Sequence, residues 1–379
     1  MRKRQTFLTL ALIVLITVPA AGQWGRQMRR HQEPLSWRHV GPQGNRISAV
    51  VCDSNDLNVY YAGACAGGVW KSTDGGTNWE PVFDKQSSQS IGSLAIAPSD
   101  SNQVWAGTGE PFIRSNVLIG DGIYKSTNAG ETWTQMGLEK PGRIGRIIVH
   151  PENPDIVFAA AQGHCYGPQK ERGVYKTTDG GKTWEQVLFV NEDTGCSGLA
   201  MDPDNPRILF AGMWPIVIKT WGKFSGGPGG GVYVSRDGGD TWEKIEGHGL
   251  PAFEVGKVDV AVAPSNSKRG YALIETGDRG SLWRSDDGGF NWRVVSYERR
   301  INERPHYYTR MCIAPDDENT VYFPCNRMYV TYDGGESIED FSGGGDCHDM
   351  WADPQHPERM MIGHDGGISL TTTRGKEWS

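Results

Sequence analysis

The sequence predicts an all-β fold, a β-propeller of about seven four-stranded antiparallel blades, and three observations support this prediction. First, a Ser/Thr-x-Asp-x-Gly-x-x-Trp motif recurs seven times in the 379 residues, and the last two copies are decayed. Second, the final position of the motif recurs every 40 to 58 residues, which is the length of one blade. Third, each motif follows a short strand pattern that is typically aromatic. The final positions are Trp79, Trp133, Trp184, Trp242, Trp292, Ile338 and Trp378.

The first repeat shows the four strands of one blade, which we name A to D in chain order. They are residues 46–53, 59–64, 68–72 and 79–83, each short, β-branched or aromatic, and bounded by Gly, Asn, Asp or Ser. Strand A ends in an elbow that carries proline in the six later repeats, where proline ends strand pairing and presets the turn. These prolines are Pro98, Pro151, Pro203, Pro264, Pro315 and Pro354.

The repeated motif is predicted to be the hairpin turn from strand C to strand D. Its Asp carboxylate accepts backbone N–H bonds, its Gly supplies a positive φ, and its Trp packs between blades. Two copies replace the Asp with Asn128 and Thr373, a change that a turn tolerates and a catalytic carboxylate does not. We therefore assign these positions to the scaffold: Asp74, Asn128, Asp179, Asp237, Asp287 and Asp333.

Residues 1–22 have the order of a secretory signal peptide: three basic residues, an apolar run from Phe7 to Val18, and then small residues. The run is too short to span a bilayer, and no later segment approaches the length of a transmembrane helix. We therefore predict a secreted or periplasmic protein. Without the three basic residues, 35 Lys and Arg remain against 45 Asp and Glu, and this acidic balance argues against nucleic acid and anionic membranes as partners.

The propeller is predicted to occupy residues 23–379. The seventh repeat stops at Ser379, directly after Trp378, so its own strand D is missing. Residues 37–40 (Trp-Arg-His-Val) repeat the Trp-x-x-Val pattern of strand D and would complete blade seven, which would close the ring and leave no free sheet edges. The alternative is that the chain is a fragment of a longer protein, and the sequence leaves both explanations open.

The seven cysteines form no regular framework, and an odd number cannot all pair within the chain. We expect mostly buried free thiols, with Cys165 and Cys196 as the candidate bridge because both are predicted in loops of one blade. The segment Asp346–Asp349, together with His364 and Asp365, offers metal-ligand side chains. Their spacing fits no standard zinc pattern, so neither a metal nor a cofactor is predicted.

Length variation falls in the loops that join strand B to C and strand D to the next A, which share one face of a meander, here called the top face. Three groups of candidate catalytic or ligand-binding residues lie in these loops. The first is Glu110, Arg114, Asn116 and Asp121; the second is Arg304, Tyr307, Tyr308 and Arg310; the third is Asp346, His348, Asp349, His364 and Asp365.

Further ligand-binding candidates are Trp214 and Trp221, which lie in the insertion at residues 214–231. Arg46, Arg143, Arg146 and Arg310 lie near the starts of A strands and predict a cationic end of the central channel, which would favour an anionic group. Tyr and Arg side chains in a concave site commonly bind sugars, carboxylates or peptide groups.

Strings such as Gly68-Val69-Trp70-Lys71-Ser72-Thr73-Asp74-Gly75-Gly76 resemble those of Asp-box, or BNR-repeat, proteins. Residues 35–379, including Asp346-Cys347-His348-Asp349, resemble the N-terminal part of large secreted bacterial sortilin-like propeller proteins, often labelled glycosyl hydrolases. This resemblance implies the fold but not an activity, because one propeller scaffold hosts many functions. Sortilin, which is similar only through the repeat, would imply a peptide-binding tunnel.

Xyloglucan-active endoglucanases resemble the chain through a Gly-Gly-aromatic strand in blade one, and they imply two carboxylates across a cleft. In that family an Asp stands two residues before the paired Gly, where this chain has Cys65. A thiol cannot serve as a general acid or base in the same way, so one of two essential positions does not match. Sialidases imply an Arg-Ile-Pro signature, and Arg46-Ile47-Ser48 lacks the proline.

The preferred function is an exported propeller that binds a peptide, protein or glycan ligand on its top face or in its channel. The alternative is a glycoside hydrolase with two carboxyls at roughly 5 to 10 Å, one of them with a pKa raised by burial. Its carboxylate pair would come from Glu110, Asp121, Asp346, Asp349 and Asp365. A third function, an assembly scaffold for other exported proteins, predicts a flat top patch without a deep pocket.

Overall fold

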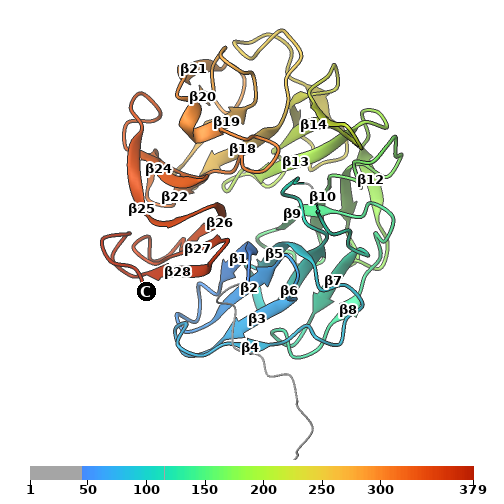
Figure 1. Ribbon diagram of the computed structural model, residues 1–379, viewed down its shortest axis with the longest axis vertical. Helices are drawn as coiled ribbons and strands as arrows, with labels where there is room; N and C mark the ends of the chain where they lie inside the picture. Colours follow the sequence, from blue (N-terminus) through green and yellow to red (C-terminus); the bar gives the residue numbers. More distant parts are fainter. Residues whose placement is uncertain (1–44, 115) are drawn as a thin grey trace, which may run out of the picture. The chain divides into compact units, whose positions relative to one another are not determined.

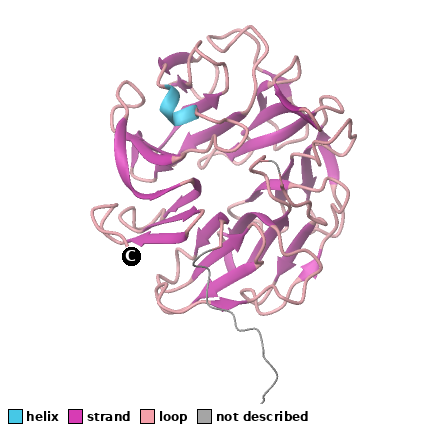
Figure 2. Ribbon diagram, in the orientation of Figure 1, coloured by secondary structure: helices cyan, strands magenta, loops and turns pink. Residues whose placement is uncertain are grey.

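The structure is a computed structural model that describes residues 45–114 and 116–379, and these residues form an all-β fold (Figure 2). Their strands make seven antiparallel sheets, and one short 3-10 helix, η1 (Arg299–Asn302), follows the fifth sheet. The predicted fold class, a propeller of about seven mostly four-stranded blades, is confirmed.

The strands of each blade follow one another in chain order, apart from a side hairpin in blade 4. Blade 1 contains β1 (Ile47–Cys52), β2 (Tyr60–Ala64), β3 (Val69–Ser72) and β4 (Glu80–Pro81), and blade 2 contains β5 (Ile91–Ala97), β6 (Asp100–Thr108), β7 (Ile123–Ser126) and β8 (Thr134–Gln135). Blade 3 contains β9 (Ile144–Val149), β10 (Val157–Ala161), β11 (Gly173–Thr177) and β12 (Glu185–Leu188). Blade 4 contains β13 (Thr194–Met201), β14 (Leu209–Lys219), β15 (Gly222–Ser225), β16 (Gly231–Ser235) and β17 (Glu243–Lys244).

Blades 5 to 7 complete the set. Blade 5 contains β18 (Val258–Ala263), β19 (Asn266–Ile274), β20 (Leu282–Ser285) and β21 (Arg293–Ser296). Blade 6 contains β22 (Cys312–Ala314), β23 (Asp317–Pro324), β24 (Arg327–Thr331) and β25 (Glu339–Gly345), and blade 7 contains β26 (Cys347–Ala352), β27 (Met360–His364) and β28 (Gly367–Thr371).

The blades follow each other around a ring, in which the first strand of each blade contacts the first strand of the next (Figure 1). β1 contacts β5, and the contacts continue through β9, β13, β18 and β22 to β26, which returns to β1. Because adjacent strands are antiparallel, the B-to-C loops and the D-to-A loops emerge on one face. Loops of blades 2, 6 and 7 are thereby brought together on the top face.

The repeated motif forms the C-to-D turn in the way its residue types predict. Asp74 Oδ1 accepts the backbone N–H of Asn78 at 2.8 Å and the Ser72 hydroxyl at 2.9 Å. Asn128 replaces Asp in blade 2 and accepts the N–H of Thr132 at 2.9 Å with its side-chain oxygen. The same bonds recur at Asp179, Asp237, Asp287 and Asp333, so these carboxylates are engaged in hydrogen bonds within the turn itself.

The second glycine of the motif and the following Trp pack between neighbouring blades. Gly181 has a φ of 93°, and a Cβ there would lie 2.7 Å from the Trp105 ring of blade 2, so the position needs a residue without a side chain. Trp184 packs edge-to-face on the same Trp105 at 6.2 Å and donates its indole N–H to the Met136 carbonyl at 2.7 Å. The motif is therefore an inter-blade contact as well as a turn.

Blade 7 has three strands among the described residues. Ser379 and Leu370 exchange two backbone hydrogen bonds of 2.9 and 3.0 Å. They are the first residues that pair across the hairpin after the turn motif. Two predictions lie outside the described residues: the signal peptide at 1–22 and the closing strand at 37–40.

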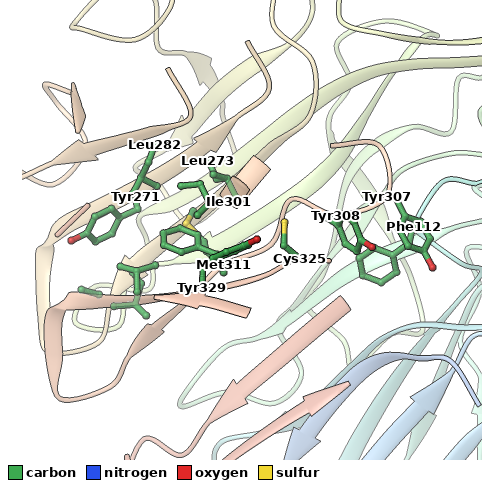
Figure 3. Close-up of a cluster of buried hydrophobic side chains, with 14 residues drawn as sticks. Phe112, Tyr271, Leu273, Leu282, Ile301, Tyr307, Tyr308, Met311, Cys325 and Tyr329 are labelled. Carbon is green, nitrogen blue, oxygen red and sulfur yellow. The ribbon is translucent and has the colours of Figure 1, made fainter. Parts of the chain in front are cut away.

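One buried cluster joins blades 5 and 6 to a loop from blade 2. Phe112, from the β6–β7 loop, is fully buried and packs with Tyr307 and Tyr308, which precede β22 (Figure 3). The cluster continues through Met311 and Ile301 to the strands of blades 5 and 6. The hydrophobic core therefore extends to the top face and forms the floor beneath the loops that carry the candidate residues.

Candidate functional site

The three groups of candidate residues meet at one place on the top face. The backbone N–H of Ile113, in the blade 2 loop, donates to the carbonyl of His306, in the loop before blade 6, at 2.9 Å. The Phe112 ring lies 4.7 Å from the ring of His348, which is in blade 7. We call this set the top-face cluster: Arg46, Glu110, Tyr307, Tyr308, Asp346, His348 and Asp365.

Glu110 is buried between two arginines. Its Oε1 lies 2.6 Å from Arg46 Nη2 and 3.0 Å from Arg114 Nε, and its side chain is fully inaccessible. Arg46 also donates through Nε to Cys65 Sγ at 3.0 Å. Burial, together with the nearby Glu110 carboxylate, raises the pKa of Cys65 to about 11, so this thiol is protonated at neutral pH. Glu110 is therefore a structural ion-pair partner without access to a ligand from solvent.

Replacing Glu110 with glutamine should lower the free energy of unfolding by about 1.5–3 kcal/mol, the net value of hydrogen bonds to charged groups. The carboxylate charge is lost while Arg46 and Arg114 still converge on the site. Both arginines are partly exposed and can recover some solvation, which keeps the loss in this range. Urea denaturation measures it, with the exposed Glu139→Gln as the matched control; equal stability of the two variants would show that the ion pairs contribute nothing.

Asp346 and Asp365 are the candidate carboxylates that the structure brings together on the top face. The backbone N–H of Asp365 donates to the carbonyl of Asp346 at 3.1 Å. The Tyr308 hydroxyl donates to Asp346, and the Tyr307 hydroxyl donates to Asp365 at 3.2 Å. The two tyrosine rings lie 4.9 Å apart, so one aromatic pair orients both carboxylates.

Asp365 is ionised and open to solvent. Its side chain is 46% exposed, and its Oδ1 lies 2.7 Å from Nε2 of the fully buried His348. Burial favours the protonated acid, but the hydrogen bond from His348 and the charge of Arg46 outweigh it and hold the pKa of Asp365 below its ordinary value. Burial lowers the pKa of His348, so a neutral imidazole donates its Nε2–H to this carboxylate. Asp365 can therefore act as a base, a nucleophile or a hydrogen-bond acceptor.

Asp121 and Asp349 do not join this pair. Asp121 accepts bonds from the hydroxyls of Ser87 and Tyr124, which belong to blades 1 and 2. Asp349 is buried near the ring axis, where it accepts the backbone N–H of Val50 at 3.1 Å and pairs with Arg146 at 3.3 Å. Of the five candidate catalytic carboxylates, Glu110 and Asp349 are thus bound in ion pairs, and Asp121 lies in a separate network.

Aspartates from other blades accompany two of the arginines that were predicted to make one end of the channel cationic. Arg310 is 4% exposed, lies 3.9 Å from Asp259 of blade 5, and donates to the Gly145 carbonyl of blade 3 at 2.7 Å. Arg146 pairs with Asp349. These ion pairs connect the inner strands across the ring.

Six ligand-binding candidates are buried: Arg143, Trp214, Tyr307, Tyr308, Arg310 and His348. Arg143 is fully buried and donates to the Gly163 carbonyl at 3.1 Å. Trp214 is fully buried and donates its indole N–H to the Ser225 hydroxyl at 2.8 Å. Trp214 turns inwards because β14 extends the blade and buries the start of the insertion.

Arg304, Trp221 and His364 are accessible to solvent. Arg304 is exposed and lies over the rings of Tyr307 and Tyr308, at 4.9 and 5.5 Å from their centroids. Trp221 is 76% exposed at the tip of the β14–β15 hairpin. His364 is half-buried at the end of β27 and bonds Ser369 at 3.1 Å.

The predicted Cys165–Cys196 bridge does not form. Cys196 lies in β13, the first strand of blade 4, whereas Cys165 lies in a loop of blade 3. Both thiols are buried, and each donates to a nearby backbone carbonyl, Cys165 to Gly163 and Cys196 to Gly198. All seven cysteines are free thiols.

Among the residues that the structure describes, no group of three or more His, Cys, Asp or Glu could hold a metal ion. In the same part of the chain, the structure contains no helix with the length and apolar character that a membrane span needs.

The sequence reasoning missed Lys257, which lies directly before β18. Its side chain is 2% exposed, and its ammonium group lies 5.5 Å from the Phe112 ring and 5.1 Å from the Trp214 ring. Nζ donates to the Tyr308 carbonyl at 2.5 Å and thereby holds the tyrosine segment of the top-face cluster. The signal available in the sequence was a lysine at the start of an otherwise apolar inner strand.

Lys257 should contribute stability that rises with pH above about 7, because burial and the neighbouring Arg310 lower its pKa to about 7. The pKa of an unfolded lysine is about 10.4, so between these values the unfolded state binds more protons and stability rises, by up to about 1.4 kcal/mol per pH unit. Below this window both states are protonated and the full cost of burying the charge remains. The measurement is the free energy of unfolding from about pH 6 to 10 for the wild type and Lys257→Met.

The difference between these two curves gives the contribution of Lys257 to the free energy of unfolding. The thiols that titrate in the same pH range are present in both proteins and cancel. Asp259 and Glu275 act in the opposite sense and limit the lowering of the pKa. Parallel curves for the wild type and Lys257→Met would contradict the prediction.

Two known protein families match parts of the chain. The family described as "Sortilin, neurotensin receptor 3" (Sortilin-Vps10) matches residues 67–208, and the BNR/Asp-box repeat matches residues 233–244, which contain the fourth copy of the motif.

Curated relatives include xyloglucanases. Xyloglucanase Xgh74A of Acetivibrio thermocellus is 26% identical over 376 residues, which cover 86% of this chain and 41% of that protein. A xyloglucanase of a Paenibacillus species is 24% identical over 299 residues, covering 70% of this chain and 27% of that protein. The chain thus spans less than half the length of these relatives.

Solved structures with the same fold include the GH74 xyloglucanase from Xanthomonas campestris, with a TM-score of 0.63, 15% identity, and coverage of 90% of this chain and 54% of that chain. YCF48 bound to D1 peptide has a TM-score of 0.57 and 16% identity, and covers 89% of this chain and 98% of that chain. At these identities the likeness shows the fold alone. The chain is therefore a β-propeller built from BNR/Asp-box repeats, similar in sequence over parts of its length to the Sortilin-Vps10 family and to xyloglucanases.

Proposed function

We propose that this chain is the propeller of an exported glycan-active protein of the glycoside hydrolase type, with a xyloglucan-like β-glucan as its substrate class. The observation that carries the proposal is the convergence of Asp346 and Asp365 on the top face, oriented by Tyr308 and Tyr307. The relatives named xyloglucanases support a glycan rather than a peptide as the ligand.

The proposed chemistry needs two carboxyl groups with different tasks. One protonates the oxygen of the glycosidic bond that breaks, and the other, ionised, attacks the anomeric carbon or activates the water that does so. The lowered pKa of Asp365 suits the ionised task. Asp346 is then the proposed acid, oriented by the Tyr308 hydroxyl. The exposed Arg304, stacked on both tyrosines, adds hydrogen-bond donors for sugar hydroxyls beside the pair.

A second candidate function is glycan recognition without hydrolysis, and Cys65 favours it. The xyloglucanase resemblance implies an Asp at this position, and a buried thiol with a pKa of about 11 cannot transfer protons as a carboxyl group does. Glu110, the nearest carboxylate to Cys65 through Arg46, is held by its two arginines. A chain that retains the sugar-contacting surface but lacks this carboxyl group would bind glucan and leave it intact.

The experiment that tests the proposal is a screen of the purified full chain against xyloglucan, mixed-linkage β-glucan and a peptide library, scoring binding and reducing-sugar release separately. Release from a β-glucan is the expected result. Binding to glucan without release would replace hydrolysis with the second candidate. Binding to peptides alone would reject a glycan substrate altogether.

A further inference from the structure

A hollow opens on the top face between blades 4 and 5, on different blades from the top-face cluster. It has a volume of about 590 Å³ and is lined by Ser225, Phe253, Glu254, Glu275, Asp278 and Arg279. A second lobe of about 350 Å³ shares Phe253 and Glu254 with it. We call the two lobes together the blade 4–5 bowl. Its size is that of a small-ligand or oligosaccharide site, and it differs from the flat top patch that an assembly scaffold would present.

The floor of the bowl holds a carboxylate in a fixed position. Glu275 Oε2 accepts the Ser225 hydroxyl at 2.5 Å and the backbone N–H of Lys257 at 2.8 Å. The carboxylate also packs against Gly256, where a Cβ would lie 1.9 Å from the same oxygen. The bowl is therefore already formed without a ligand.

The rim combines an aromatic ring with charges of both signs. Phe253 is 38% exposed, and the Arg279 guanidinium lies 4.5 Å from its ring centroid. Glu254 and Asp278 are exposed beside this pair. A ligand in the bowl therefore meets donors on Arg279, acceptors on the two carboxylates, and an apolar ring edge.

Only some ligands satisfy such a lining. An anion is repelled by Glu254, Glu275 and Asp278, and a cation cannot stack on Phe253 because Arg279 already covers the face of its ring. A sugar hydroxyl both donates to a carboxylate and accepts from a guanidinium, and the C–H edges of a sugar ring pack on an aromatic side chain. We infer that the blade 4–5 bowl is a second sugar-binding site, which takes a neutral segment of a glycan; the choice of a glycan rests on the proposed function.

Lys257 joins the bowl to the top-face cluster. Its backbone N–H binds the Glu275 carboxylate at the floor of the bowl, and its Nζ binds the Tyr308 carbonyl of the cluster. The two sites are thus linked through one buried residue.

Titration calorimetry with xyloglucan oligosaccharides and cello-oligosaccharides tests this inference, using the full chain with Asp365→Asn to prevent turnover. Phe253→Ala and Asp278→Asn, each added to that chain, should weaken binding at least about tenfold. The matched control is Phe290→Ala. Phe290 is also exposed and is stacked by Arg236 at 3.9 Å, but it belongs to the turn motif of blade 5 on the opposite face.

The inference would be overturned by unchanged affinity in Phe253→Ala, by an equal loss in Phe290→Ala, or by a lack of binding of any oligosaccharide. Displacement of the sugar by a basic peptide would also overturn it. Reducing-sugar release by the wild type separates this result from the proposed function. Binding that depends on Phe253, without release, would reject hydrolysis and keep the bowl. Release together with binding that ignores Phe253 would reject the bowl and keep hydrolysis.

Discussion

Asp365→Asn should lower the rate of glucan hydrolysis by about 10²–10⁴-fold, the contribution of a positioned acid or base. Asparagine has the same shape and keeps an oxygen that can accept the bonds from His348 and Tyr307, but it cannot carry the negative charge. Since the side chain is 46% exposed, the fold should remain intact. Initial rates of reducing-sugar release, measured as kcat and KM separately, should show the loss in kcat.

The control for this variant is Asp204→Asn. It removes an exposed carboxylate from the turn between strands A and B of blade 4, on the face opposite the top face. Its rate should equal that of the wild type, and circular dichroism should show the same fold for both variants. If Asp365→Asn keeps the wild-type rate, Asp365 has no part in catalysis. If the wild type itself releases no sugar, recognition without hydrolysis is the better account.

Phe112→Ala should lower the free energy of unfolding by about 3–5 kcal/mol, the range for removing a buried aromatic ring from a core. Phe112 is fully buried and belongs to the cluster that joins blades 5 and 6 to the blade 2 loop (Figure 3). Its ring lies 4.7 Å from the His348 ring and 5.5 Å from the Lys257 ammonium group, and Tyr308 belongs to the same cluster, so little around it can collapse into the cavity. Urea unfolding followed by tryptophan fluorescence measures the change.

The matched control is Phe290→Ala, which removes a ring that is 57% exposed and should change stability by less than about 0.5 kcal/mol. Phe112→Leu should lie between the two, because it keeps much of the buried apolar volume. A loss below about 1 kcal/mol in Phe112→Ala would mean that the top-face loops rearrange to fill the cavity, and that Phe112 does not support the cluster.

The turn motif could be interpreted from sequence because its bonds are local. Asp74 bonds residues two and four positions away, so its residue type and spacing already specify the geometry. The role of the motif as scaffold, including the Asn128 copy, therefore needed no tertiary information. The face that carries the variable loops could also be predicted, because strand order alone decides it.

Burial of individual loop residues could not be predicted. Trp214 and Trp221 lie in the same insertion, yet one is fully buried and the other is 76% exposed. The Cys165–Cys196 prediction was wrong because strand boundaries are uncertain in sequence, and Cys196 belongs to the inner strand of the next blade. The ion pair of Arg310 depends on Asp259, an acidic residue inside an apolar strand that lies 51 positions away in the sequence.

The sequence by itself determined the all-β propeller, its repeat and its scaffold residues, because short-range hydrogen bonds and strand periodicity depend on residues that are close in sequence. Only the tertiary structure decided which candidates form a site. Glu110, Tyr307, His348 and Asp365 come from three blades, and they meet because β26 returns to β1 and brings distant loops together. The same packing buries Glu110 and leaves Asp365 open, and this difference in solvent access decides which carboxylate can reach a ligand.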